Sequence, residues 1–171
     1  MNKYGTFWRR FWAGWVDSFV FLPVYIVNIH VMNCASSMPV IFFALWYVTM
    51  SFLWYGYSIC LHGKYGQTLG KMALKVKVLD VSESRQIGFK QAIMRDAPPL
   101  ILTIALLPHD LNQIFNGTSY MLHKGAMPDK VSIVLGFIAV GWGLLEVITM
   151  LSNSKRRAIH DFIAKSVVVR I

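Results

Sequence analysis

Three stretches of this chain are apolar over nearly the whole length that a membrane-spanning helix needs, roughly 20 residues. They cover residues 11–29, 39–61 and 131–151. Together they contain two charged residues, Asp17 and Glu146. A fourth stretch, 87–108, is weaker, because its uncharged part is short and begins at Pro98-Pro99. Charged residues make up 15% of the chain, against roughly 25% in soluble domains. The sequence therefore predicts an all-α integral membrane protein.

The basic residues indicate how many of these stretches cross the membrane. If all four cross, both termini and residues 62–86 lie on one side, together with 15 of the 17 lysines and arginines. If 87–108 does not cross, only 12 lie on that side. Basic residues concentrate on the cytoplasmic side of a membrane. We therefore expect four transmembrane helices with cytoplasmic N- and C-termini, in a bacterial inner (plasma) membrane. The same distribution explains the net charge of +9 without a nucleic-acid partner.

Two short segments on the cytoplasmic side have the pattern of β-strands. Residues 75–80 alternate between apolar and polar side chains, and residues 166–171 form a second strand-like run at the end of the chain. A lone strand of this size would leave both of its edges unpaired. The sequence therefore predicts a small cytoplasmic β-strand pair, which would bring Val76 and Val78 close to residues 167–169.

A glycine-rich turn precedes the first of these strands and ends at Lys71. A phosphate-binding loop would need a glycine at the position of Tyr65 and a serine or threonine at that of Met72, so a nucleotide site is not expected. We interpret the segment as a turn whose lysines contact lipid phosphates. The histidines lack a convergent metal-ligand spacing, and the chain shows no nucleophile with its base. We therefore expect no cofactor, no metal site and no enzymatic activity.

Charged residues inside the apolar stretches are costly and therefore informative. Asp17, Asp96 and Glu146 all fall in the inner half of the membrane, with Arg10 and Arg95 nearby. One interpretation is structural: Asp17 pairs with Arg10, Arg95 or a helix end, and Asp96 starts a helix before a proline break. The other is functional: the carboxyl groups form a cation or proton site in a wet inner pocket, and the arginines set their pKa values by proximity.

Four features in this order are similar to the RDD family of small multi-spanning membrane proteins, which is named for one arginine and two aspartates. They are Arg10, Asp17 with Ala13 between them, the loop Gly66-Gln67-Thr68-Leu69-Gly70-Lys71, and the tail Arg156-Arg157-Ala158-Ile159-His160-Asp161. The resemblance treats residues 1–171 as a single domain and makes Arg10, Asp17 and Asp161 the name-giving residues. We also expect Arg157, His160 and Asp161 to dock the tail under the helices.

The resemblance implies transport of ions or small ligands, with sodium/proton exchange attributed to some family members. The leading hypothesis is membrane transport or ion exchange, in the form of cation/proton exchange through an acidic inner pocket. Four helices are few for a complete transporter, so a homo-oligomer is expected. The alternative is a non-catalytic membrane scaffold or a subunit of a larger membrane complex. It is supported by small residues on one face of the last stretch, at Ser132, Gly136, Ala139 and Gly143.

Overall fold

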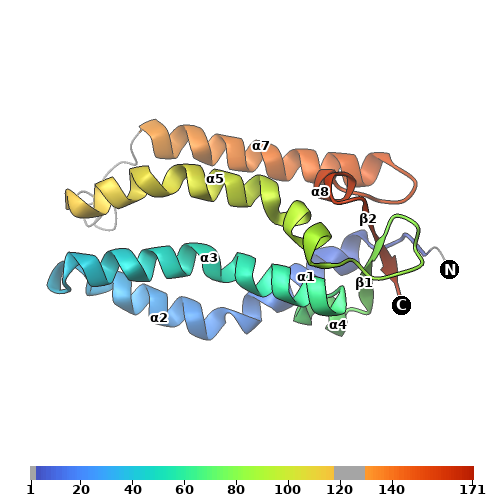
Figure 1. The fold of residues 1–171 in the computed structure, drawn as a ribbon, viewed down its shortest axis with the longest axis horizontal. Helices are drawn as coiled ribbons and strands as arrows, with labels where there is room; N and C mark the ends of the chain where they lie inside the picture. The colour runs from blue at the N-terminus through green and yellow to red at the C-terminus, as the bar shows by residue number, and fades with distance from the viewer. Residues whose placement is uncertain (1–2, 118–129) are drawn as a thin grey trace.

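The computed structural model describes residues 3–117 and 130–171 (Figure 1). Its long helices are α1 (Phe7–Val20), α2 (Leu22–Asn33), α3 (Val40–Tyr65), α5 (Phe89–Phe115) and α7 (Lys130–Ser152), with a 3-10 turn, η1 (Ala35–Ser37). The short elements are α4 (Leu69–Ala73), α8 (Ile159–Ile163), β1 (Val76–Asp80) and β2 (Ser166–Arg170). The molecule is elongated, and α4, α8, both strands and both chain ends gather at one end of the long helices.

Within the described residues, two helices are by themselves long and apolar enough to cross a membrane. These are α3 and the segment Ile133–Ser152 of α7. A third candidate is α1 together with α2, which meet at an angle of 54° and would form one broken span. The break follows from Pro23, which lacks the backbone N–H that would continue a helix but suits the first turn of a new one.

The fourth predicted span corresponds to α5, which does not meet the same test of length and hydropathy. This helix carries Arg95 and Asp96 near one end and Asp110 near the other, and it packs along α3 more extensively than any other two elements pack. It also continues through Pro98, Pro99 and Pro108. The expectation that Asp96 starts a helix before a proline break is therefore wrong: Asp96 lies inside the helix, which begins at Phe89.

The predicted strand pair is confirmed. Strands β1 and β2 are antiparallel, and Val78 faces Val168 at the middle of the register, while Val76 faces Arg170. Val76, Val78 and Val168 are buried in a core that Ile87 completes. The pair thereby joins the end of the chain to the loop between α3 and α5.

The two halves of the chain repeat the same local structure. Adding 90 to the bounds of α4 and β1 gives the bounds of α8 and β2. Lys75 and Lys165, which precede the two strands, both have positive φ angles, 54° and 50°. The backbone N–H of Val81 donates to the carbonyl of Lys165, and the N–H of Ile171 donates to that of Lys75, at 2.9 and 3.0 Å. These reciprocal bonds give the sheet a local two-fold axis between Val78 and Val168.

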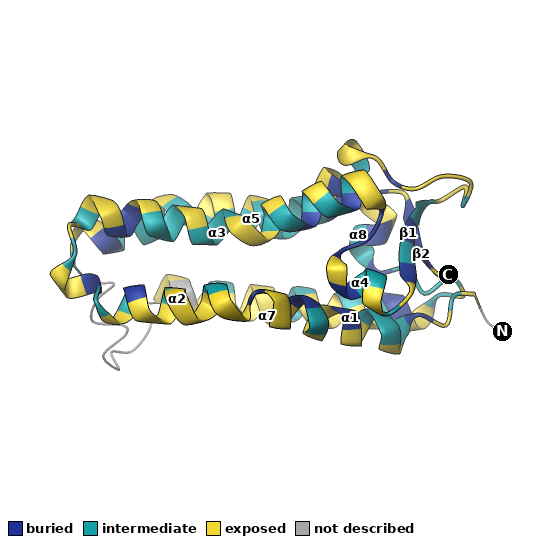
Figure 2. Ribbon diagram, turned by 90° about the horizontal axis from the view of Figure 1, so that it is seen from below, coloured by how far each residue is buried: buried dark blue, intermediate teal, exposed yellow. Residues whose placement is uncertain are grey.

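Buried residues concentrate at the end of the molecule that holds the strands, whereas the long helices are exposed along their outer faces (Figure 2). Only 11% of the most apolar window of α3 is buried, and 6% of that of α7. Uncovered helices this apolar are expected where lipid rather than water surrounds them. The buried core around the strands and the uncovered apolar helices therefore form two regions of one molecule.

Candidate functional site

A cavity of about 200 Å³ lies where the long helices meet the short elements. Both halves of the chain line it, from α1, α3 and α4 on one side and α5, α7 and α8 on the other. Its charged or titratable lining residues are Arg10, Asp17, His62, Lys71, Arg95, Asp96 and His160. We call it the central cavity. It brings together most of the charged residues that the sequence placed inside the apolar stretches.

Asp161 joins two arginines beside this cavity. Its carboxylate lies 2.9 Å from Nη2 of Arg10 and 3.0 Å from Nη1 of Arg95, and it is fully buried. Burial alone would raise the pKa of Asp161, but Arg10 and Arg95 outweigh this effect and hold the pKa well below its ordinary value. The tail is therefore docked, as expected. The arginines pair with Asp161, so of the three partners expected for Asp17, which were Arg10, Arg95 or a helix end, the helix end remains.

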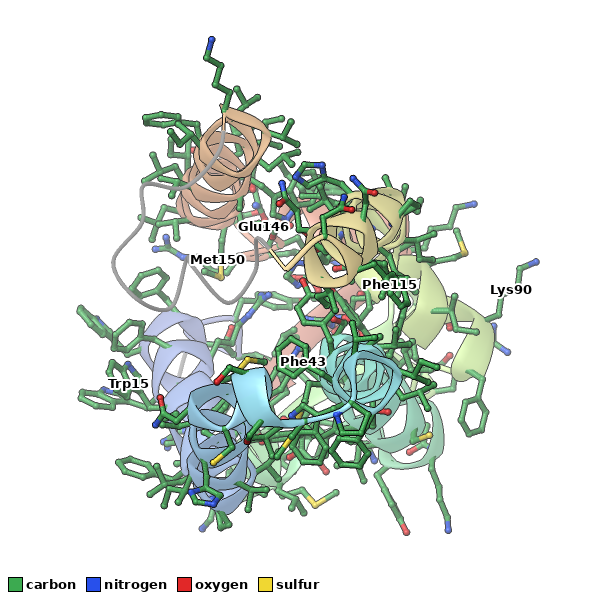
Figure 3. The ribbon with its side chains drawn as sticks, turned by 90° about the vertical axis from the view of Figure 1, so that its left-hand side faces the viewer. Trp15, Phe43, Lys90, Phe115, Glu146 and Met150 are labelled. Carbon is green, nitrogen blue, oxygen red and sulfur yellow. The ribbon has the colours of Figure 1, made fainter. Side chains whose placement is uncertain are left out.

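His160 connects this cluster to Glu146 on α7. Its Nε2 lies 3.2 Å from Arg10 and 2.8 Å from Arg95, and its Nδ1 lies 2.7 Å from Oε2 of Glu146. A guanidinium can only donate, so Nε2 must accept and the ring proton sits on Nδ1, beside the carboxylate. Burial, and then the charge of Arg95, lower the pKa of His160. Figure 3 shows Glu146 directed from α7 toward the other helices.

Asp17 holds α1 against α4 and α3. Its two oxygens accept hydrogen bonds from the hydroxyls of Tyr57 and Thr68 at 2.6 and 2.7 Å and from the backbone N–H of Gly70 at 2.7 Å. The side chain is almost fully buried. Since all three partners donate and an ionised carboxylate only accepts, the arrangement suits the charged form. The contacts of Asp17 favour the structural interpretation, with a helix end as its partner.

Asp17→Asn should therefore lower stability. The amide retains one acceptor oxygen, but its NH₂ group must face a donor, which leaves a buried group unpaired at a cost of about 1.5–3 kcal/mol. We expect a lower unfolding temperature in detergent and less protein in the membrane. Tyr57→Phe, which removes one of the three donors and leaves the carboxylate in place, should cost less. An asparagine variant that unfolds at the wild-type temperature would contradict this structural role.

The loop 66–71 is built to reach Asp17. Gly66 ends α3 with a φ of 70°, in the left-handed region that favours glycine. Gln67 donates to the carbonyl of Val76 at 2.9 Å, and Thr68 caps α4 while donating to Asp17. At Gly70 an added Cβ would lie 2.0 Å from the carbonyl oxygen of Ala13, so only glycine allows this approach. The motif thus fastens α4 to α1.

Lys71 does not lie where the sequence interpretation put it. It faces the central cavity, and its Nζ lies 2.6 Å from Nε2 of His62 rather than at a lipid surface. Nδ1 of His62 lies 2.8 Å from the carbonyl of Ser58, which can only accept, so Nε2 is free to accept from the lysine. Burial, followed by the charges of Arg95 and Arg10, holds the pKa of Lys71 well below its ordinary value.

Asp96 differs from the other acidic residues of the site. It lines the central cavity, its Oδ2 is buried, and no hydrogen-bond partner is found for that oxygen among residues 3–117 and 130–171. In the same part of the chain neither Asp96 nor Lys71 forms an ion pair, although the charge of Asp96 acts on Lys71 through space. An Asp96 oxygen without a hydrogen-bond partner therefore shares one cavity with the Lys71 ammonium, which contacts a ring nitrogen of His62 but no carboxylate among the described residues.

Most of the residues that the sequence predicted for the site are found there, but several have partners other than those expected. Arg10, Asp17, Arg95 and Asp96 meet at the cavity, and Glu146 reaches it through His160. Arg157 lies outside, where it donates to the carbonyls of Ser166 and Asp161 and stacks on Phe162. The pocket is not simply acidic, because three basic residues line it. Sequence reasoning did not find His62, Trp54 or Trp142, which also line the cavity.

The model of the RDD family matches residues 4–165, which is nearly the whole chain. The comparisons with curated proteins and with solved structures find no match. The family match covers Arg10, Asp17 and Asp161 together with the loop 66–71.

Proposed function

The chain belongs to the RDD family, and from this premise we propose that it is a membrane transporter that exchanges a cation for protons at the central cavity. The family and the uncovered apolar helices identify a membrane protein. The observation that carries the proposal is that Asp96 and Lys71 lie on the wall of one cavity without an ion pair to any described residue, and that Oδ2 of Asp96 has no hydrogen-bond partner there.

This pair supplies a mechanism for exchange. A cation that enters the cavity is attracted by Asp96 and repels the positive charge of Lys71, which favours loss of the lysine proton. Burial and the neighbouring arginines already lower the pKa of Lys71. The proton leaves through His62, whose Nε2 is in hydrogen-bond contact with Lys71. When the cation departs, the proton returns. Cation and proton thus occupy the cavity in turn, which is the requirement for coupled exchange.

The repeated halves support the same function. Many transporters consist of two structural repeats with the substrate site at the interface between them. Here α4 and β1 in one half correspond to α8 and β2 in the other, and the central cavity takes side chains from both halves. A site at such an interface can open to either side of the membrane when one half moves against the other.

Proton exchange can be measured in proteoliposomes that contain a pH-sensitive dye. We expect an inward cation gradient to release protons from vesicles with the wild-type protein. Asp96→Asn should abolish this signal while the protein accumulates normally, because the unpartnered Oδ2 contributes no hydrogen bond to the fold. Asp80→Asn, at the half-buried end of β1 and outside the cavity lining, is the matched control and should retain exchange. Undiminished exchange in Asp96→Asn would show that the cation binds elsewhere.

We further propose four membrane crossings, with α5 as the third, in a bacterial inner membrane with both termini in the cytoplasm. Cys34 would then lie outside, together with the loop around 116–124, of which residues 118–124 fall outside the described part of the chain. In intact cells carrying Cys60→Ser, a membrane-impermeant thiol reagent should label Cys34. In the same background with Cys34→Ser added, Ser154→Cys should stay unlabelled. The reverse labelling pattern would invert the orientation.

The scaffold alternative rests on α7. This helix makes its main contact with α8 alone, and an added Cβ at Gly136 or Gly143 would meet nothing within 4 Å. The expected packing of the small-residue face is therefore not made within the described chain, and the side chain of Ser132 lies outside the description. A second copy or another subunit would fit against α7 in either function. Wild-type protein that assembles but moves no protons would favour the scaffold.

A further inference from the structure

We propose that the cation taken by the central cavity is a small organic ammonium ion rather than a bare metal ion. The inference rests on the proposed exchange function and names its substrate class. Three observations carry it: the size of the cavity, the two tryptophans on its wall, and the small number of carboxylate groups that are free to bind a metal ion.

The cavity is too large for a single bare ion. Its volume of about 200 Å³ equals that of six or seven water molecules at roughly 30 Å³ each. A monovalent metal ion would occupy a small part of this space and would need the rest to be filled with ordered water. An organic cation of about five to eight non-hydrogen atoms would fill the same volume on this scale.

The wall of the central cavity contains two tryptophans, whose rings can bind an organic cation. Trp54 on α3 and Trp142 on α7 both line the cavity that contains Asp96. Indole faces are the strongest aromatic partners of cations, and they recognise quaternary ammonium groups in particular. The ring of Trp54 is held in place by Phe21 and Tyr57, at centroid distances of 5.3 and 5.7 Å. One carboxylate with two indole faces is a set of groups that suits an alkylammonium ion.

Metal coordination, by contrast, finds few free ligands here. In the described residues no three His, Cys, Asp or Glu side chains are grouped so that they could hold a metal ion. The oxygens of Asp17 are already used by three donors, and Asp161 is taken by two arginines. Asp96 alone remains available, which suits a cation that is recognised by charge and shape.

The surrounding charges allow a cation to enter. The lining holds two acidic groups, Asp17 and Asp96, and three basic ones. Two further carboxylates, those of Asp161 and Glu146, lie directly beside it, in contact with lining residues. Both arginines are paired with Asp161, and His160 accepts from them through Nε2. Acidic groups therefore outnumber basic ones, and the difference grows when Lys71 gives up its proton.

Tetramethylammonium is the most direct probe, because its permanent charge keeps it from crossing the lipid or titrating by itself. In proteoliposomes of the full chain, we expect it to release protons at a concentration at least tenfold lower than sodium or potassium. Trp142→Leu should raise its half-saturating concentration about tenfold, and Trp142→Phe should raise it less. Trp15→Leu is the matched control, since Trp15 points away from the helices (Figure 3), and it should change nothing.

The outcomes separate this inference from the function on which it rests. Proton release by sodium or potassium but not by tetramethylammonium would overturn the substrate class and leave cation/proton exchange standing. If no cation releases protons, the exchange function is wrong. Binding of tetramethylammonium to the detergent-solubilised protein then tests whether the cavity takes an organic ammonium ion. A rise in unfolding temperature with tetramethylammonium that Trp142→Leu removes would support an ammonium site. No rise would overturn it.

Discussion

Asp161→Asn should cause the largest loss of stability of any single charge removal in this protein, about 3–5 kcal/mol. Asp161 is fully buried between Arg10 and Arg95, with contacts of 2.9 and 3.0 Å. Without its charge the two guanidinium groups face each other in a buried site, with no compensation beyond His160 and the carboxylate behind it. Thermal unfolding in detergent and the amount of protein in the membrane should both fall sharply.

Asp80→Asn again provides the comparison, because it changes a half-buried aspartate whose carboxylate accepts hydrogen bonds from Ser82 and Gln91. The amide of asparagine can keep one of these hydrogen bonds, and the loss of the other should cost about 0.5–1.5 kcal/mol. Asp161→Asn should also detach the tail, so that a protease added to the detergent-solubilised protein cuts near residues 153–158. Equal unfolding temperatures for the two variants would show that Asp161 does not hold the arginines.

The local patterns of the sequence were sufficient to predict part of this arrangement. Alternation of apolar and polar residues predicted both strands, and the need to cover their edges predicted their pairing, because both arguments concern neighbouring residues. Arg10 and Asp17 are seven residues apart, about two helical turns, and both line the central cavity. The partners of these two residues were not predictable, since Asp161 and Gly70 come from distant segments that only the folded chain brings together.

The remaining differences have identifiable physical causes. Pro23 breaks the first predicted span, whereas Pro98 and Pro99 leave α5 continuous, because α5 packs along α3 and tertiary contacts outweigh the local effect of proline. The repeat was visible in the sequence as the similar runs 72–78 and 162–168, each with a lysine before a valine-rich strand. Seven residues are too few for this similarity to be convincing without the matching positive φ angles.

Gly70→Ala is expected to disrupt the contact between α1 and α4, at a cost of about 3 kcal/mol. The added Cβ would lie 2.0 Å from the carbonyl oxygen of Ala13 and 2.8 Å from Cγ of Asp17. The nearer atom is backbone, so relief requires one helix to move, and overpacking of this kind costs about 1–3 kcal/mol. Such a movement also lengthens the bonds that Asp17 accepts, which adds about 1.5 kcal/mol or more. The unfolding temperature should fall accordingly.

The matched substitution is Gly56→Ala in the interior of α3, where an added Cβ meets nothing within 4 Å. Alanine favours a helix over glycine by about 1 kcal/mol, so this variant should be as stable as the wild type or slightly more stable. The pair separates the effect of close approach from that of backbone flexibility, because both changes add the same methyl group. If Gly70→Ala and Gly56→Ala unfold at the same temperature, the position of α4 does not depend on its contact with α1. Lys71 would then reach the central cavity even though the loop that carries it is not held by Asp17.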